Sequence, residues 1–131
     1  MVYLDTDILI NLLRGGKSAV KILKELEEKG ERIKTTSINS LELYKGCYKS
    51  KETEENLKTV RRMLENIEIH DFKEEDSEFA AKILNELREK GEKIGEFDSI
   101  ISSIILNNND YLITRNQKHF SKIPHLEIQE W

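Results

Sequence analysis

Short apolar segments alternate with amphipathic helical patterns along the whole of this 131-residue chain. The first apolar segment is Met1-Val2-Tyr3-Leu4, and the last is Leu126-Glu127-Ile128. A strand that is followed by a helix and then by a second strand forms a crossover in which the two strands run parallel. The alternation therefore predicts an α/β fold with a mostly parallel sheet that helices cover on both faces.

Apolar periodicity and glycine breaks give approximate limits for these elements. The predicted strands are 2–5, 32–36, 67–70, 111–113 and 126–128. The predicted helices are 7–13, 17–29, 39–48, 52–66, 74–90 and 96–107. Asn39 or Ser40 is expected to cap the third helix. The last helix is apolar on most sides, which is typical of a central, buried helix.

Composition excludes some classes of protein. The net charge is −4, so there is no overall basic field, and contact with nucleic acid requires a local basic patch or a bound metal. The one cysteine, Cys47, cannot form an internal disulfide, which favours a reducing, cytoplasmic location. No apolar run approaches the roughly 20 residues that a membrane span needs. We expect one domain over residues 1–131, because no linker-like segment divides the chain.

Three aspartates lie in apolar surroundings. Asp5 directly follows the first strand, Asp7 comes two residues later, and Asp98 lies at the start of the buried helix. α/β proteins assemble their sites at the carboxyl ends of the strands, and a desolvated carboxylate is unfavourable unless a partner such as a metal neutralises it. The other aspartates, which occupy turns and helix starts that favour this residue, are Asp71, Asp76 and Asp110.

Glu42 is a further acidic candidate. The stripe that we predict to be buried on helix 39–48 comprises Leu41, Tyr44 and Tyr48. Taken alone, Glu42 is best interpreted as an exposed residue paired with Lys45 or Lys49. Gly46 favours a functional interpretation, because a glycine inside a helix costs about 1 kcal/mol and often marks a close approach by another group.

Together, Asp5, Glu42 and Asp98 predict an acidic pocket. Several hard oxygen ligands suit Mg²⁺ or Mn²⁺. Zinc is not favoured, because the three histidines are scattered and there is only one cysteine. The chain has no glycine-rich phosphate loop and no local signature of a Ser or Cys nucleophile with a His base.

Four segments follow one another in the chain. They are Leu4-Asp5-Thr6-Asp7-Ile8-Leu9-Ile10, Ser40-Leu41-Glu42-Leu43-Tyr44-Lys45-Gly46, Phe97-Asp98-Ser99-Ile100-Ile101 and Leu112-Ile113-Thr114-Arg115-Asn116-Gln117-Lys118-His119-Phe120. Their order and spacing resemble the PIN-domain family, and most closely the VapC-type toxins of prokaryotic toxin–antitoxin pairs. The resemblance covers nearly the whole chain and implies a metal-dependent ribonuclease. The implied fold is a three-layer α/β/α sandwich with a central sheet of about five strands.

The resemblance also implies roles for individual residues. Asp5, Glu42 and Asp98 fall on the family's acidic metal-binding positions, and Asn116 falls on a fourth position where many relatives have an aspartate. Asparagine still offers a carbonyl oxygen, but it lacks the negative charge of an aspartate. The resemblance therefore does not imply a second tightly held metal for this chain. The expected supporting residues, which hydrogen-bond to the carboxylates or lie around them, are Thr6, Asp7 and Thr114. For Asp7, a role as the N-cap of helix 7–13 is equally well supported.

The resemblance implies an RNA substrate, cut by hydrolysis to leave a 5′-phosphate, and two protein partners. One partner is a second copy in a homodimer, and the other is a cognate antitoxin that inserts a segment into the active-site groove. The candidate phosphate contacts, which flank the predicted pocket, are Arg14, Lys45, Lys49, Arg115 and Lys118.

Two alternatives stay open at this point. Asp5-Thr6-Asp7 after a strand resembles the motif of haloacid-dehalogenase phosphatases, in which Asp5 would be the nucleophile. The absence of an aspartate pair after Ile113 counts against that interpretation. The second alternative is a PIN-type module that binds RNA or a protein partner without cutting, and Asn116 is its only support.

Overall fold

The computed structural model describes all of residues 1–131, which form a five-stranded sheet and seven helices. The strands are β1 (Val2–Leu4), β2 (Ile33–Thr36), β3 (Glu68–His70), β4 (Tyr111–Ile113) and β5 (Glu127–Gln129). The helices are α1 (Thr6–Leu13), α2 (Lys17–Glu28), α3 (Ser37–Lys49), α4 (Thr53–Leu64), α5 (Glu74–Glu89), α6 (Glu96–Asn107) and α7 (Gln117–Phe120). The strand order is β3-β2-β1-β4-β5, and all neighbouring strands are parallel, which confirms the predicted fold class.

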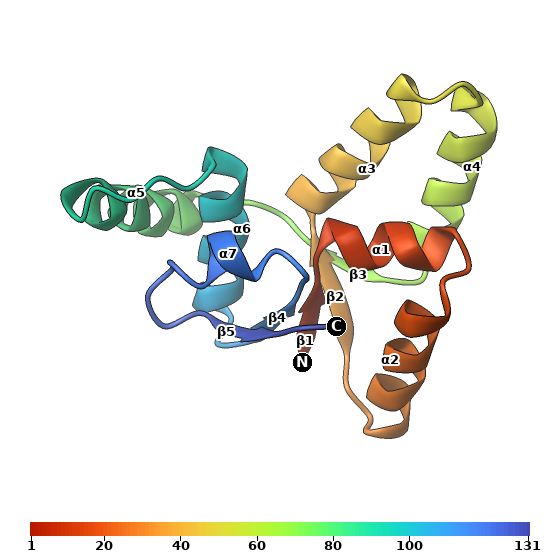
Figure 1. The fold of residues 1–131 in the computed structure, drawn as a ribbon, viewed down its shortest axis with the longest axis horizontal. Helices are drawn as coiled ribbons and strands as arrows, with labels where there is room; N and C mark the ends of the chain where they lie inside the picture. Colours follow the sequence, from red (N-terminus) through yellow and green to blue (C-terminus); the bar gives the residue numbers. More distant parts are fainter.

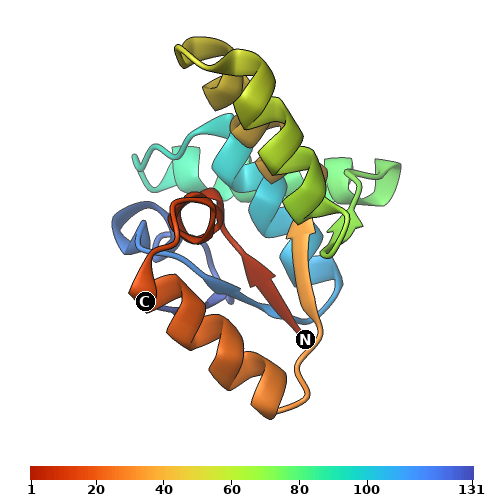
Figure 2. The same cartoon turned by 90° about the vertical axis from the view of Figure 1, so that its right-hand side faces the viewer.

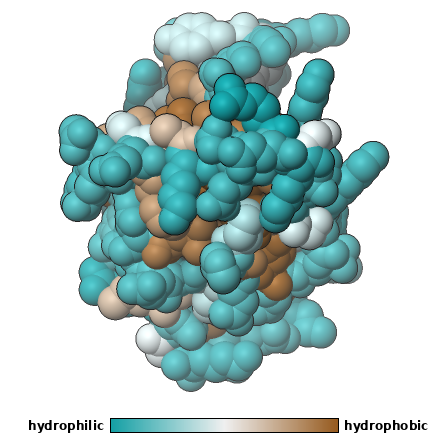
Figure 3. Space-filling model, turned by 90° about the vertical axis from the view of Figure 1, so that its left-hand side faces the viewer, coloured by the Kyte–Doolittle hydropathy of each residue, from teal (hydrophilic) through white to brown (hydrophobic).

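Two layers of helices enclose the sheet (Figures 1 and 2), and alternate side chains of β1 pack against one layer and the other. Val2 and Leu4 pack in an apolar cluster with residues of α1 to α4. Tyr3, between them, packs with Ile101 and Ile104 of α6. This follows from the strand geometry, in which successive side chains point to opposite faces. The outer surface beside α5 and α6 is mostly hydrophilic, with apolar patches between the polar side chains (Figure 3).

The start of α3 differs from the prediction. The N-cap is Thr36, not Asn39 or Ser40, and the helix begins at Ser37. Asn39 instead completes a capping box: its N–H donates to Oγ1 of Thr36 at 3.2 Å, and the N–H of Thr36 donates to Oδ1 of Asn39 at 3.3 Å. Asn39 is buried, so its side-chain amide is available only to groups inside the protein.

The remaining elements agree with the prediction to within a few residues, except for α7. This single turn was not predicted, because four residues are too few for a helical period to show. The prediction that helix 96–107 is central is confirmed. Its three buried serines, Ser99, Ser102 and Ser103, each donate a 2.7 Å hydrogen bond to a backbone carbonyl of the same helix.

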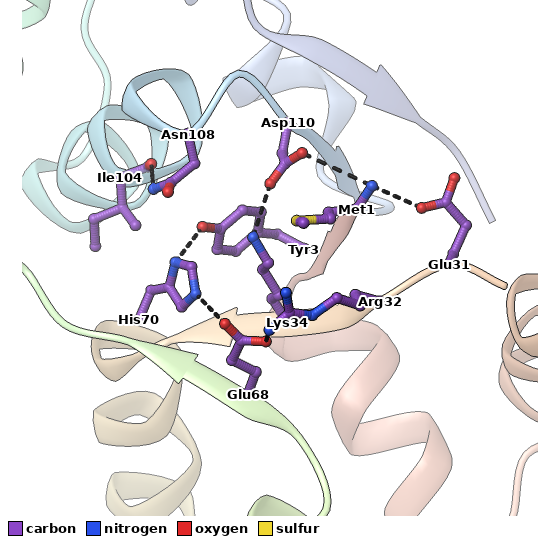
Figure 4. Close-up of polar contacts among 10 residues, drawn as sticks. All are labelled: Met1, Tyr3, Glu31, Arg32, Lys34, Glu68, His70, Ile104, Asn108 and Asp110. Carbon is purple, nitrogen blue, oxygen red and sulfur yellow. Dashed lines mark hydrogen bonds and ion pairs between the residues drawn. The ribbon is translucent and has the colours of Figure 1, made fainter.

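A buried ion pair lies near the amino ends of the strands (Figure 4). Nζ of Lys34 on β2 donates to Oδ2 of Asp110, just before β4, at 3.1 Å. The same ammonium group lies 5.4 Å from the ring centre of Tyr3. Burial raises the pKa of Tyr3, so its hydroxyl stays protonated, and it forms a 2.6 Å hydrogen bond with Nδ1 of His70 on β3. These contacts connect β1, β2 and β3 with Asp110, the residue that precedes β4.

Candidate active site

The candidate site lies where β1 and β4 end, side by side, at the carboxyl edge of the sheet. These strands are neighbours with Leu4 opposite Ile113, so the residues that follow them, Asp5 and Thr114, meet. Asp5 is the N-cap residue of α1 and is only 7% exposed. Parallel α/β sheets bind ligands at this edge, where the strand connections diverge to the two sides.

Asp5 is held by neutral donors and has no ion-pair partner. Thr114 donates its hydroxyl to Oδ2 of Asp5 at 2.7 Å, and the side-chain amide of Asn39 donates to Oδ1 at 3.0 Å. Burial raises the pKa of Asp5 to about 6, and repulsion from Asp7 and Glu42 adds to the rise, which the Thr114 bond partly offsets. A cation bound here relieves both causes of the raised pKa.

Glu42, on α3, faces the same edge. Thr6 donates its hydroxyl to Oε1 of Glu42 at 3.0 Å, and Thr6 itself accepts a 2.9 Å bond from the amide of Asn39. Burial raises the pKa of Glu42, and the charges of Asp98 and Asp7 raise it further. The exposed, Lys45-paired interpretation is therefore wrong: Glu42 is half-buried, and Lys45 acts on its pKa without forming an ion pair.

The predicted buried stripe of α3 is also wrong. Leu41 and Tyr48 are 47% and 70% exposed, whereas the buried row is Asn39, Leu43 and Cys47, spaced four residues apart. The polar Asn39 belongs to the buried face because it serves the carboxylates, which apolar periodicity alone does not show. A Cβ placed on Gly46 would meet no atom within 4 Å, so no group of this chain approaches it closely.

Asp98 lies in the first turn of α6, opposite α7. Nδ1 of His119 is 3.3 Å from Oδ2 of Asp98 and 3.1 Å from the amide nitrogen of Asn116. Burial raises the pKa of Asp98, and His119 partly offsets this rise. Asn116 is the N-cap of α7, and its N–H donates to Oγ1 of Thr114 at 2.9 Å. Asn116 and Asp98, two of the predicted metal-site positions, thus both contact His119.

Asp7 is not the N-cap of α1, because Asp5 has that position. Its Oδ2 accepts hydrogen bonds from the N–H of Arg115 at 2.8 Å and from the hydroxyl of Thr114 at 3.2 Å. Its Oδ1 accepts a 3.0 Å bond from the indole N–H of Trp131. Asp7 therefore links the segment after β4 to the end of the chain.

The structure places three further residues around these carboxylates to which the sequence analysis gave no role in the site: Asn39, His119 and Trp131. His119 lies 21 residues from Asp98 and Trp131 lies 124 residues from Asp7, and the fold brings each pair together. The candidate phosphate contacts divide into two groups. Arg14 and Arg115 line one hollow together, while Lys45, Lys49 and Lys118 are exposed, without an ion-pair partner.

The carboxylates share one edge without forming a closed cage. No three His, Cys, Asp or Glu side chains in residues 1–131 are close enough together to hold a metal ion in this arrangement. The donor set nevertheless fits a hard divalent cation. All its acidic members offer oxygen, the cysteine is buried in the core, and no Lys or Arg forms an ion pair with Asp5, Asp7 or Glu42.

Comparison with known proteins gives consistent results. Residues 2–126 match the PIN domain family. Ribonuclease VapC2 of Rickettsia felis is 33% identical over 132 residues, which cover 100% of this chain and 98% of that protein. The crystal structure of VapBC2 from Rickettsia felis, bound to a DNA fragment from the promoter, has a TM-score of 0.91 at 33% identity, with 100% of this chain and 99% of that chain covered.

A second similar structure is a toxin–antitoxin complex from Klebsiella pneumoniae, with a TM-score of 0.73 at 25% identity, covering 96% of this chain and 95% of that one. No helix of the present structure is both long and apolar enough to cross a membrane. The family match over most of the chain and the full-length relative agree with the order of motifs and with the acidic edge of the sheet. The chain belongs to the PIN-domain family and, within it, to the VapC ribonucleases.

Proposed function

We propose that this protein is a metal-dependent endoribonuclease, the toxin of a toxin–antitoxin pair, and that residues 1–131 are a single PIN domain. One observation carries the proposal: Asp5 is buried at the carboxyl edge of the sheet among like charges, and its hydrogen-bond partners are all neutral. A purely structural carboxylate in this position is unfavourable, whereas a metal ligand requires it. Family membership removes the haloacid-dehalogenase alternative.

Asp5, Glu42 and Asp98 are the side chains that would hold Mg²⁺ or Mn²⁺, with Asn116 offering an amide oxygen beside Asp98. When bound, such an ion activates water and stabilises negative charge on the attacked phosphate. The chain's own contribution is orientation. Asn39 and Thr114 fix the two oxygens of Asp5, and Thr6 fixes Glu42.

The substrate is RNA, whose phosphates need cationic contacts that the net charge of −4 does not supply in bulk. Arg14, Lys45, Arg115 and Lys118 are the proposed contacts. Arg115 follows β4 directly, and Lys118 lies on α7 next to His119. Their position beside the acidic edge supports a role in placing the phosphate rather than in general solubility.

A cognate antitoxin is the proposed partner, by analogy with the toxin–antitoxin complex from Klebsiella pneumoniae. A hollow of about 260 Å³ adjoins Glu42 between α1, α3 and α4, where apolar Ile10 and Leu13 lie beside Arg14. An inserted segment with apolar side chains and one polar end suits such a lining. A homodimer is the proposed assembly of the toxin itself.

The test is cleavage of single-stranded RNA by the purified protein with Mn²⁺ or Mg²⁺. We expect cleavage that EDTA abolishes and that Asp98→Asn abolishes while leaving the fold intact by circular dichroism. Asp71→Asn is the matched control, because Asp71 is an exposed loop residue and its loss should leave cleavage unchanged. If the wild type binds RNA but never cuts it with either metal, the non-catalytic binding module replaces the nuclease.

A further inference from the structure

Trp131, the only tryptophan of the chain, makes three contacts with the segment that borders the carboxylates. Its indole N–H donates to Asp7, its ring lies 3.5 Å below the guanidinium carbon of Arg115, and its main-chain oxygen accepts a 3.2 Å bond from Nε of Arg115. The ring also packs against the apolar cluster of α1 to α4. Trp131 is thus anchored on one side and holds Arg115 on the other.

These contacts keep Arg115 away from the nearest carboxylate. Asp7 receives the backbone N–H of Arg115, while the guanidinium of the same residue is stacked on the indole ring. The terminal nitrogens of Arg115 have no hydrogen-bond or ion-pair partner anywhere in the chain. A stacked guanidinium with both terminal nitrogens available is already ordered for two parallel hydrogen bonds to an anion.

A hollow of about 250 Å³ opens beside this arrangement, lined by Asp7, Ile10, Asn11, Arg14, Arg115 and Trp131. Two arginines line it together with one acidic side chain, Asp7, which already accepts hydrogen bonds from the N–H of Arg115 and the indole N–H of Trp131. The hollow therefore presents two guanidinium groups next to an acidic edge. The hydroxyl of Thr114 contacts both Asp7, which lines the hollow, and Asp5, a proposed metal ligand. Only the side chain of Thr114 therefore lies between the hollow and Asp5.

We propose that Trp131 is a positioning residue, which holds the guanidinium of Arg115 for a backbone phosphate of single-stranded RNA in this hollow. The proposal rests on the proposed ribonuclease function and deepens it by naming a phosphate subsite beside the one that is cut. Because the phosphate here is not the scissile one, its capture strengthens binding of the substrate without taking part in hydrolysis. Stacking removes much of the side-chain freedom that a free arginine loses when it binds a phosphate.

The test is binding of a short, fluorescein-labelled single-stranded RNA in EDTA, followed by anisotropy, so that no cutting interferes. Arg115→Lys keeps the charge but loses the planar stack, and Trp131→Leu removes the ring while keeping Arg115. We expect each to raise the Kd about fivefold. Trp131→Phe, which retains a ring for stacking, should restore most of the affinity. The control is Arg88→Gln, an exposed arginine on α5.

Salt dependence separates positioning from loss of charge. Arg115→Gln should lower the slope of log Kd against log salt by about 0.7, whereas Trp131→Leu should weaken binding with the slope unchanged. Emission from Trp131 should also change when RNA is added to the wild type. Thermal unfolding confirms that each variant is folded, and Arg115→Lys tests the proposal with Trp131 intact.

The inference fails if Arg115→Lys and Trp131→Leu bind the RNA as tightly as the wild type. That outcome is distinct from failure of the proposed function. If the wild type cuts RNA with Mn²⁺ and these two variants have unchanged KM, the subsite is wrong and the nuclease stands. If the wild type never cuts RNA, the nuclease is wrong, and the binding measurements in EDTA still decide the role of Trp131.

Discussion

The hydroxyl of Thr114 donates a 2.7 Å hydrogen bond to Asp5, which lies 109 positions earlier in the chain. The two residues meet because each directly follows one of two neighbouring parallel strands, β4 and β1. On the other oxygen of Asp5, the amide of Asn39 donates at 3.0 Å. Both donors are neutral, so they orient the carboxylate without cancelling its charge. Asp5 is therefore arranged for a ligand at the expense of stability.

Replacing Asp5 with asparagine should stabilise the protein while abolishing metal-dependent cleavage. The pKa of Asp5 is raised to about 6, so the folded state holds this proton to higher pH than the unfolded state does. Its contribution to the free energy of unfolding is therefore largest below pH 4 and is lost as pH rises towards 6. We expect Asp5→Asn to be more stable than the wild type by about 1–3 kcal/mol at pH 7.

Urea unfolding at several pH values measures this effect, with both proteins free of metal. The difference between wild type and Asp5→Asn should shrink as pH falls from 7 to 4, because the wild-type carboxyl becomes protonated. A loss of stability at pH 7 in the variant would instead show that Asp5 has a structural role.

Mn²⁺ should stabilise the wild type more at pH 7 than at pH 5. Metal and proton compete for Asp5, whose pKa of about 6 lies between these values. A ligand that binds only the folded state raises the free energy of unfolding by about 2.7 kcal/mol at a hundred times its Kd, and the unfolding temperature rises with it. Thermal unfolding with and without Mn²⁺ measures the shift, and Asp5→Asn should show little shift at either pH. An equal shift in both proteins would remove Asp5 from the metal site.

Asn39→Ala should destabilise the fold by about 2–3 kcal/mol, although Asn39 is polar and lies on no predicted site motif. The substitution removes half of the α3 capping box, together with the donors to Asp5 and Thr6. Asn85→Ala, at an exposed position of α5, is the control and should cost under about 0.5 kcal/mol. Chemical denaturation compares the two, and equal losses would mean that the buried amide is not needed.

How much of this site the sequence predicts depends on whether a residue's role is local. Asp5 stands out because a strand pattern ends on it, and Asp98 because it opens a helix that is apolar on most sides. Asn39 and Trp131 do not stand out, since their partners are set by the order of strands in the sheet. The buried row of α3 was misassigned for the same reason. A hydrophobicity pattern treats Asn39 as exposed and predicts a buried stripe of Leu41, Tyr44 and Tyr48, of which Leu41 and Tyr48 are in fact exposed.

The Lys34–Asp110 pair gives a prediction away from the site. Lys34→Met should cost about 3 kcal/mol, because it leaves Asp110 nearly buried without its main cationic partner. The double variant with Asp110→Asn should recover a large part of that loss. The exposed pair of Arg32 and Glu68 is the control, and Arg32→Gln should cost under about 1 kcal/mol. Urea denaturation measures both losses. Equal losses in Lys34→Met and Arg32→Gln would mean that burial does not make the Lys34–Asp110 pair more important than the exposed one.

Asn116→Asp should bind Mn²⁺ more tightly and be less stable without metal. Asn116 lies beside His119, which contacts Asp98, so the new carboxylate adds an oxygen ligand and a like charge to the same corner of the site. Without metal, repulsion from Asp98 should cost about 1 kcal/mol of stability. With metal, a gain of about tenfold in affinity is expected, together with a second binding event in calorimetric titration. Asn66→Asp, in the exposed turn that follows α4, adds the same charge elsewhere and should leave Mn²⁺ binding unchanged. If Asn116→Asp leaves Mn²⁺ binding unaltered, the corner formed by α6 and α7 is not part of the metal site, and Asp5 and Glu42 must bind the ion without it.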